Sequence, residues 1–215
     1  MLVFNEKETE QFVVGPAGGL QLLTLSPQKA KNALAIVCHP HPLYQGTMRN
    51  KVVFTMAKAF HDLGLKTVRF NYRGVEQSEG SYGEGIGETA DAMAVIAAAK
   101  AALPDHDLYL AGFSFGTFVA ASACNQLPET KGLLTVAPSM EHFDFTPLTA
   151  INCPWLIAQG TEDEVISAPA VYAFAKENAQ RVTLETFEGV GHFFHGHLNP
   201  LRETIKTFFE PIVNT

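Results

Sequence analysis

The chain has 215 residues and carries 15 Lys and Arg against 22 Asp and Glu, so its formal net charge is −7. A hydrophobic content of 47% with 17% charged residues excludes an intrinsically disordered chain. The negative balance, with no block of basic residues, argues against nucleic-acid binding and against attachment to an anionic membrane surface. We therefore expect a globular protein with a small-molecule partner, no nucleic-acid partner and no membrane partner; nothing in the sequence supports a homo-oligomer.

The cysteines and the N-terminus indicate the cellular compartment. Cys38, Cys124 and Cys153 are odd in number, widely spaced and set among apolar residues, which predicts buried thiols and no structural disulfide. The N-terminal residues lack the charged-then-apolar pattern of a signal peptide, and no run approaches the roughly 18 apolar residues of a membrane span. These features predict a cytoplasmic protein.

The predicted elements begin with two strands at residues 10–14 and 20–25, joined by a glycine-rich turn into an antiparallel hairpin. Strands and helices then alternate. The pattern predicts strands at 33–38, 66–71, 108–112, 132–137, 154–160 and 182–189, with helices at 48–63, 89–102, 115–125 and 169–179. Asn199 and Pro200 open a last helix.

The strands after the hairpin are continuously apolar rather than alternating, which indicates burial on both faces of the sheet. This pattern predicts a doubly wound α/β fold: a mostly parallel sheet of about eight strands with helices on both faces. We expect one domain over residues 1–215. In such sheets ligands bind at the carboxyl ends of the strands, so chemistry is sought in the loops that follow them.

The loop after the predicted strand at residues 108–112 carries a candidate nucleophile. Residues 112–116 read Gly-Phe-Ser-Phe-Gly between a predicted strand and a predicted helix, which is typical of a nucleophile elbow with Ser114 at its tip. The glycines allow strand and helix to approach closely around a strained residue. The alternative is a turn of small residues without catalysis.

A serine hydroxyl needs a base, and the base needs an orienting acid. His192 is the first histidine after the last strand and is the preferred base over His195 and His197, although a structural histidine is the alternative. Asp163, in the loop after residues 154–160, is the preferred acid. The other acids considered are Asp144, Glu162 and Glu164.

With the chain order Ser114, Asp163, His192 and the elbow, residues 10–212 resemble the α/β-hydrolase superfamily. The chain is most similar to small bacterial esterase-like and dienelactone-hydrolase-like members, with Ser114 where dienelactone hydrolases carry cysteine. Three further runs carry this likeness. They are residues 38–42 (CHPHP) with 46–48 (GTM), 70–75 (FNYRGV), and 191–194 (GHFF). The resemblance implies a serine hydrolase with a Ser-His-Asp triad.

A tetrahedral oxyanion requires two N–H donors, one of which is expected from Phe115 behind the nucleophile. The second is expected in the loop after residues 33–38. Pro40 and Pro42 have no N–H, so the backbone of His41 is preferred and that of Leu43 is the alternative.

The short stretch at residues 138–152 replaces any large lid, so we expect an open site for small acyl groups. The aromatic side chains expected to bind substrate are Phe113, Tyr44 and Phe193; Phe115, Phe143 and Phe145 are further candidate walls. Arg73 is expected to form a structural ion pair rather than to bind an anion.

These observations predict a serine hydrolase that cleaves carboxylic esters or thioesters and uses no metal or other cofactor. Two alternatives remain. One is a catalytically silent scaffold for protein interaction. The other is a metal-dependent hydrolase that uses the His-x-His pairs at residues 39–41 and 195–197.

Overall fold

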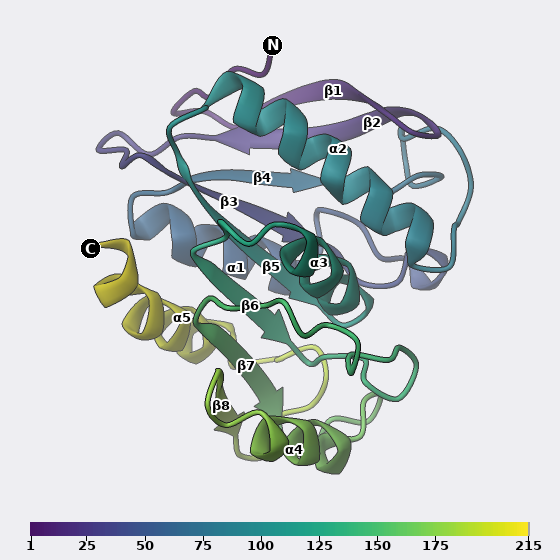
Figure 1. Ribbon diagram of the computed structural model, residues 1–215, viewed down its shortest axis with the longest axis vertical. Helices are drawn as coiled ribbons and strands as arrows, with labels where there is room; N and C mark the ends of the chain where they lie inside the picture. The colour runs from purple at the N-terminus through teal and green to yellow at the C-terminus, as the bar shows by residue number, and fades with distance from the viewer. Residues whose placement is uncertain (215) are drawn as a thin grey trace.

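The computed structural model describes residues 1–214, and its chain opens with the expected antiparallel hairpin. β1 (Thr9–Gly15) pairs with β2 (Gly18–Leu25) in antiparallel register from Thr9 opposite Thr24 to Gly15 opposite Gly18. β2 is also antiparallel to β4 (Lys66–Phe70), so the hairpin forms one end of the sheet. Figure 1 shows it beside the N-terminus.

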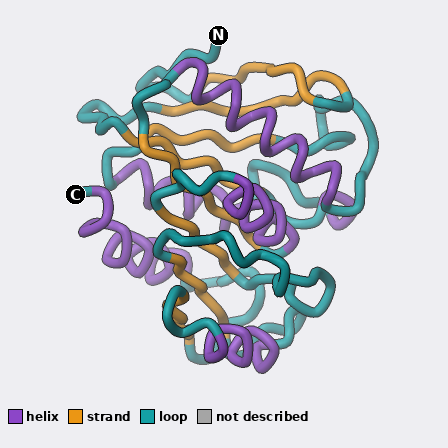
Figure 2. Tube along the Cα trace, in the orientation of Figure 1, coloured by secondary structure: helices purple, strands orange, loops and turns teal. Residues whose placement is uncertain are grey.

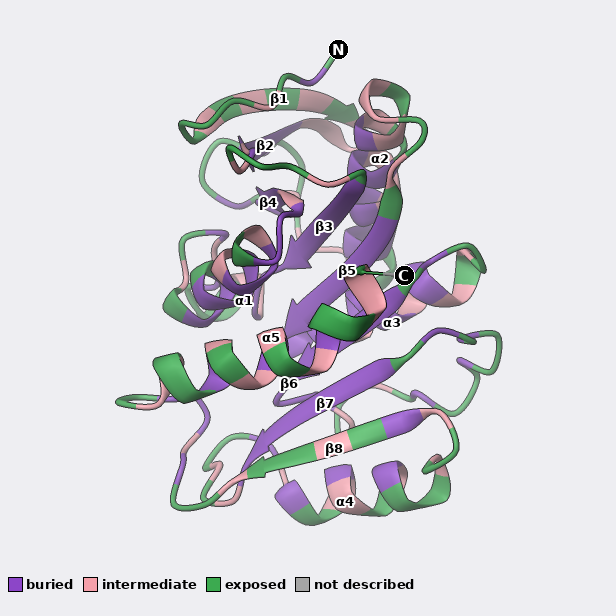
Figure 3. Cartoon of the chain, turned by 90° about the vertical axis from the view of Figure 1, so that its left-hand side faces the viewer, coloured by how far each residue is buried: buried purple, intermediate pink, exposed green. Residues whose placement is uncertain are grey.

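The remaining strands run parallel and complete an eight-stranded sheet in the order β1-β2-β4-β3-β5-β6-β7-β8. They are β3 (Ala33–Cys38), β5 (Asp107–Phe113), β6 (Gly132–Val136), β7 (Trp155–Gly160) and β8 (Val182–Phe187). β3, β6 and β7 are buried along their whole length, whereas β1 and β8 at the edges alternate with exposed positions (Figure 3). The predicted doubly wound sheet is therefore confirmed.

Helices cover both faces of this sheet, and the period of two in the strands divides the core between them. α2 (Ile86–Ala102), α3 (Phe115–Gln126) and α4 (Ala168–Glu177) pack on the face that carries Leu34 and Ile36. α1 (Lys51–Asp62) and α5 (Leu198–Val213) pack on the opposite face, with Ala35 and Val37 (Figure 1).

Two helices begin three residues away from the start that the sequence predicts. α1 starts at Lys51 rather than 48, because the Asn50 side chain accepts hydrogen bonds from the amides of Val52 and Val53 and so caps the helix there. α2 starts at Ile86 rather than 89, since the Glu88 side chain accepts from the Gly85 amide at 2.7 Å and fixes the first turn.

The carboxyl ends of the parallel strands meet at one edge of the sheet, where long loops gather (Figure 2). The loops after β3, β5, β6, β7 and β8 all reach this edge, so residues far apart in sequence come together there. Within residues 1–214, no helix has the length and apolarity needed to cross a membrane.

Candidate active site

Ser114 lies at the tip of a tight turn between β5 and α3. Its backbone has φ 54° and ψ −121°, a conformation that costs energy for a residue with a side chain. The turn leaves no room for a side chain at either glycine. A Cβ at Gly112 would lie 2.1 Å from the carbonyl oxygen of Gly116, and a Cβ at Gly116 would lie 2.5 Å from the carbonyl oxygen of Cys38. Both glycines are thus required for the close approach of strand, helix and the end of β3.

His192 lies beside the serine. Its Nε2 is 3.1 Å from Ser114 Oγ, and its Nδ1 is 2.9 Å from Asp163 Oδ2. The ring packs against Phe113 at 5.0 Å between centroids, and its backbone amide donates to Glu164 Oε2 at 3.0 Å. Because a carboxylate accepts from Nδ1–H, Nε2 is the nitrogen left to accept the serine proton.

The Asp163 carboxylate is fixed from several sides. Oδ1 accepts from the amides of Val165 (2.9 Å) and Ile166 (2.7 Å), and Oδ2 accepts from Gln159 Nε2 at 3.1 Å. Burial raises the pKa of Asp163, but hydrogen bonds from His192 and from the two amides outweigh this, so the pKa lies below its ordinary value. The carboxylate is therefore ionised at neutral pH and oriented toward the imidazole.

The loop after β3 turns sharply around His41. Its carbonyl accepts from the amides of Tyr44 and Gly46, both at 3.1 Å, and its ring nitrogen accepts from the Leu43 amide at 3.2 Å. Leu43 N–H is therefore occupied. In residues 1–214 the amides of His41 and Phe115 meet no acceptor, and the two rings lie 4.9 Å apart at their centroids.

Two cavities open on Ser114. The first, which we call the aromatic cavity, holds about 310 Å³ and is bounded by Tyr82, Phe115, Ser139, Phe143 and Ile166. The second, the histidine cavity, holds about 420 Å³ and is bounded by Pro40, Gln45, Gly46, Asn50, His192 and Phe193. Both also contact a shared border of His41, Tyr44, Ser114, His142 and Val165.

Comparison with known proteins places the chain among α/β hydrolases. A family model described as an alpha/beta hydrolase domain matches residues 45–205. The structure of an alpha-beta serine hydrolase homologue from Coxiella burnetii is 41% identical, has a TM-score of 0.90, and the match covers 96% of this chain and 99% of that one. The chain belongs to the α/β-hydrolase family.

Two further relatives agree with this assignment. XC6422 from Xanthomonas campestris, an a/b serine hydrolase without lid, is 36% identical with a TM-score of 0.90, over 95% of this chain and 94% of that one. Protein RP471 of Rickettsia prowazekii (strain Madrid E) is 33% identical over 203 residues, which are 90% of this chain and 85% of that protein. This α/β hydrolase thus has the fold of serine hydrolases, which supports hydrolase activity.

The competing candidates for base and acid lie elsewhere. His195 is exposed and His197 half-buried, and their one mutual contact runs from the His197 ring to the His195 carbonyl. Asp144 is exposed and bonds to Thr146, and Glu162 is exposed. Glu164 touches the His192 backbone amide, not its ring.

His39 is held inside the protein. It is fully buried, with Nδ1 2.7 Å from the Pro40 carbonyl and Nε2 accepting from the Tyr72 amide at 3.1 Å. Burial lowers the pKa of His39 to about 3, so its ring is neutral. Both nitrogens are engaged, so His39 has no free lone pair for a metal. Residues 1–214 also contain no group of three His, Cys, Asp or Glu side chains arranged to hold a metal ion.

Two of the aromatic residues expected at the substrate lie elsewhere in the structure. Phe113 is fully buried beneath His192 and Phe193 and lines neither cavity, because it follows Tyr109 and Ala111 on the face of β5 that packs against α1 and α5. Phe145 is buried as well. Tyr44 and Phe193 do border the cavities, as do Phe115 and Phe143.

Arg73 forms a two-pronged ion pair with Asp91, whose side chain is fully buried. The hydrogen bond to Asp91 raises the pKa of the Arg73 guanidinium by more than burial lowers it, so the guanidinium remains charged. Sequence analysis missed Tyr82, Ser139 and His142, which line the aromatic cavity. All three lie in loops, where no periodic pattern shows which way a side chain points.

Proposed function

We propose that this α/β hydrolase is a serine hydrolase that cleaves small carboxylic esters or thioesters without a metal. One observation carries the proposal: Asp163, His192 and Ser114 form a continuous chain of hydrogen bonds of 2.9 and 3.1 Å, ending at a hydroxyl that faces two cavities. A hydroxyl becomes a nucleophile when a base so placed takes its proton.

In the first half-reaction Ser114 Oγ bonds to the carbonyl carbon while its proton moves to His192 Nε2. The carbonyl oxygen gains negative charge and accepts from the amides of Phe115 and His41. The carbonyl reforms, its bond to the leaving oxygen or sulfur breaks, and His192 gives the proton to that atom. Asp163 keeps the imidazole in the correct tautomer and balances its transient positive charge.

In the second half-reaction water replaces the alcohol or thiol. His192 takes one proton from water as the hydroxide oxygen attacks the acyl carbon, and then returns it to Ser114 Oγ as that bond breaks. The products are the carboxylic acid and the free enzyme. The loop between β6 and β7 contains no helix, so no helical lid covers the site and small substrates can reach it.

The test is hydrolysis of p-nitrophenyl acetate and butyrate and of the matching thioesters, followed by release of the chromophore or thiol. We expect wild-type turnover, with kcat lowered by about 10⁴-fold or more in Ser114→Ala and in His192→Ala. Asp144→Asn, which changes an exposed acid outside the site, is the control. A folded wild type that hydrolyses none of these compounds, or a Ser114→Ala variant with full activity, would refute the proposal and favour a silent scaffold.

A further inference from the structure

The two cavities differ in their access to His192. The leaving oxygen of an ester receives its proton from His192 Nε2 and therefore departs on the side of that nitrogen. His192 borders the histidine cavity and does not border the aromatic cavity. The geometry therefore separates the two halves of an ester: the alcohol lies in the histidine cavity and the acyl group in the aromatic cavity.

The far wall of the aromatic cavity is a pair of stacked rings. Phe143 and Phe118 have centroids 4.6 Å apart and an interplanar angle of 23°. Phe115 packs edge-on against Phe143 at 5.4 Å, and a Cβ at Gly85 would lie 3.0 Å from Phe143 and 3.1 Å from Phe118. The stack is thus held on two sides, and its position is fixed by packing.

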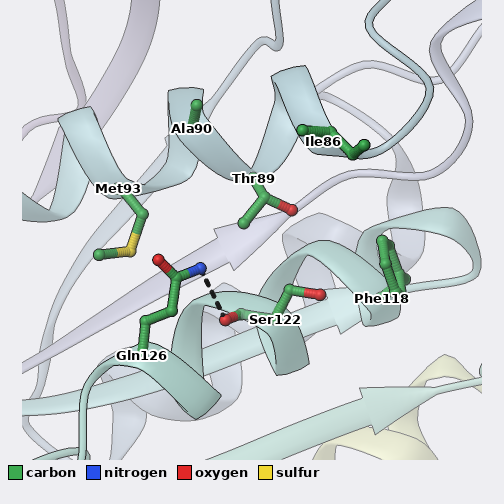
Figure 4. Close-up of a pocket in the computed structure, with 7 residues that line it drawn as sticks. All are labelled: Ile86, Thr89, Ala90, Met93, Phe118, Ser122 and Gln126. Atoms are coloured by element: carbon green, nitrogen blue, oxygen red, sulfur yellow. Dashed lines mark hydrogen bonds between the residues drawn. The ribbon is translucent and has the colours of Figure 1, made fainter. Parts of the chain in front are cut away.

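Behind the stack lies a surface groove between α2 and α3, of about 520 Å³. Figure 4 shows its walls: Ile86, Thr89, Ala90 and Met93 from α2, and Phe118, Ser122 and Gln126 from α3. Phe118 borders this groove and Phe143 borders the aromatic cavity, so the two rings are the partition between them.

We propose that the Phe118–Phe143 stack closes the acyl cavity and restricts this enzyme to short or single-ring acyl groups. The proposal rests on the proposed function. The wall itself is aromatic, and Tyr82 and Phe115 face the same space, which suits an apolar or aromatic acyl group. A long alkyl chain would have to displace both Phe143 and Phe118 before it could reach the apolar groove beyond.

The test compares kcat/KM for p-nitrophenyl acetate, butyrate, octanoate and laurate. In the double variant Phe118→Ala/Phe143→Ala the acyl cavity joins the groove, and each methylene newly buried there strengthens transition-state binding by about fourfold. We expect the octanoate-to-acetate ratio of kcat/KM to rise by about tenfold or more over wild type, since several methylenes gain a contact surface. Phe143→Ala and Phe118→Ala each leave one ring of the partition in place and should raise the ratio by less than the double variant does.

Two variants serve as controls. Phe54→Ala truncates an exposed phenylalanine of α1 that borders neither the acyl cavity nor the groove, so the acyl ratio should stay at the wild-type value. Phe193→Ala enlarges the histidine cavity and should change the preference among butyrate esters of different alcohols, not the acyl ratio. If Phe143→Ala unfolds, Phe143→Leu replaces it in the test. Leu keeps an apolar side chain, so we expect a smaller rise in the octanoate-to-acetate ratio.

The outcomes separate this proposal from the one on which it rests. A wild type that cleaves no ester refutes both. A wild type that cleaves short esters, with an unchanged acyl ratio in folded Phe143 and Phe118 variants, refutes the partition and leaves the serine mechanism standing. A Phe143→Ala variant that alters alcohol preference instead of acyl preference reverses the assignment of the two cavities and overturns the proposal.

Discussion

Replacing Asp163 by Asn tests how the imidazole is oriented. The amide oxygen of Asn can still accept from the amides of Val165 and Ile166. The amide nitrogen, however, would face His192 Nδ1 and Gln159 Nε2, both of which donate to the native carboxylate. His192 would then favour the tautomer with its proton on Nε2, which cannot accept the proton of Ser114.

The expected loss in kcat follows from this change. Loss of the correct tautomer and of the charge that balances the imidazolium costs about 10³- to 10⁴-fold in kcat, or about 4–5.5 kcal/mol of activation free energy. KM should change little, because Asp163 borders neither cavity. The opposed donors at Gln159 should also lower the free energy of unfolding by about 1–3 kcal/mol.

The assay is steady-state hydrolysis of p-nitrophenyl butyrate at a temperature where circular dichroism shows the variant folded. Glu164→Gln and Asp144→Asn are matched carboxylate-to-amide controls. Glu164 accepts from the backbone amide of His192 and not from its ring, so we expect less than about a tenfold loss there. The assignment of Asp163 as the acid is wrong if Asp163→Asn retains kcat within tenfold of wild type. It is also wrong if the kcat of either control variant falls by more than tenfold.

Three further predictions concern stability. Burial lowers the pKa of His39 to about 3 in the folded protein. As the pH falls below about 6.5, this histidine is protonated in the unfolded chain but stays neutral in the folded protein. The free energy of unfolding therefore drops by about 1.4 kcal/mol per pH unit. Urea unfolding at pH 7 and pH 5 should show a smaller pH dependence in His39→Gln, by about 2 kcal/mol; equal dependence would contradict the burial argument. Gly116→Ala puts a Cβ 2.5 Å from two carbonyl oxygens and should lower Tm by several degrees, at about 2–4 °C per kcal/mol; an unchanged Tm would show that the elbow can relax. The free thiols of Cys38, Cys124 and Cys153 are all buried, so they should react with a thiol reagent only after denaturation. Rapid labelling of the native protein would contradict this prediction.

The parts of the fold and site that follow from short-range patterns were predictable from sequence. Continuous apolar strands alternating with helices predicted the parallel sheet, and the hairpin was visible in the turn at residues 15–19. The elbow at Ser114 is also local, since its two glycines lie within two residues of the serine. The catalytic roles of Ser114, Asp163 and His192 remain our proposal, although the structure brings the three side chains together.

What the sequence could not show depends on tertiary placement. Phe113 was expected to contact the substrate, yet the alternation of β5 places its ring on the face of the sheet that α1 and α5 cover, against His192. Tyr82 reaches the aromatic cavity from a loop whose path is set by Glu88, which accepts from the amides of Gly83 and Gly85. Such long-range contacts leave no periodic pattern in the chain.

The central claim is that Ser114 is an activated nucleophile. The most direct measurement is labelling of the folded protein with a fluorophosphonate, followed by intact mass and peptide mapping. We predict a single adduct on the peptide that contains Ser114, absent from Ser114→Ala and strongly reduced in His192→Ala. A folded wild type that gives no adduct, or an adduct that persists in Ser114→Ala, would contradict the account.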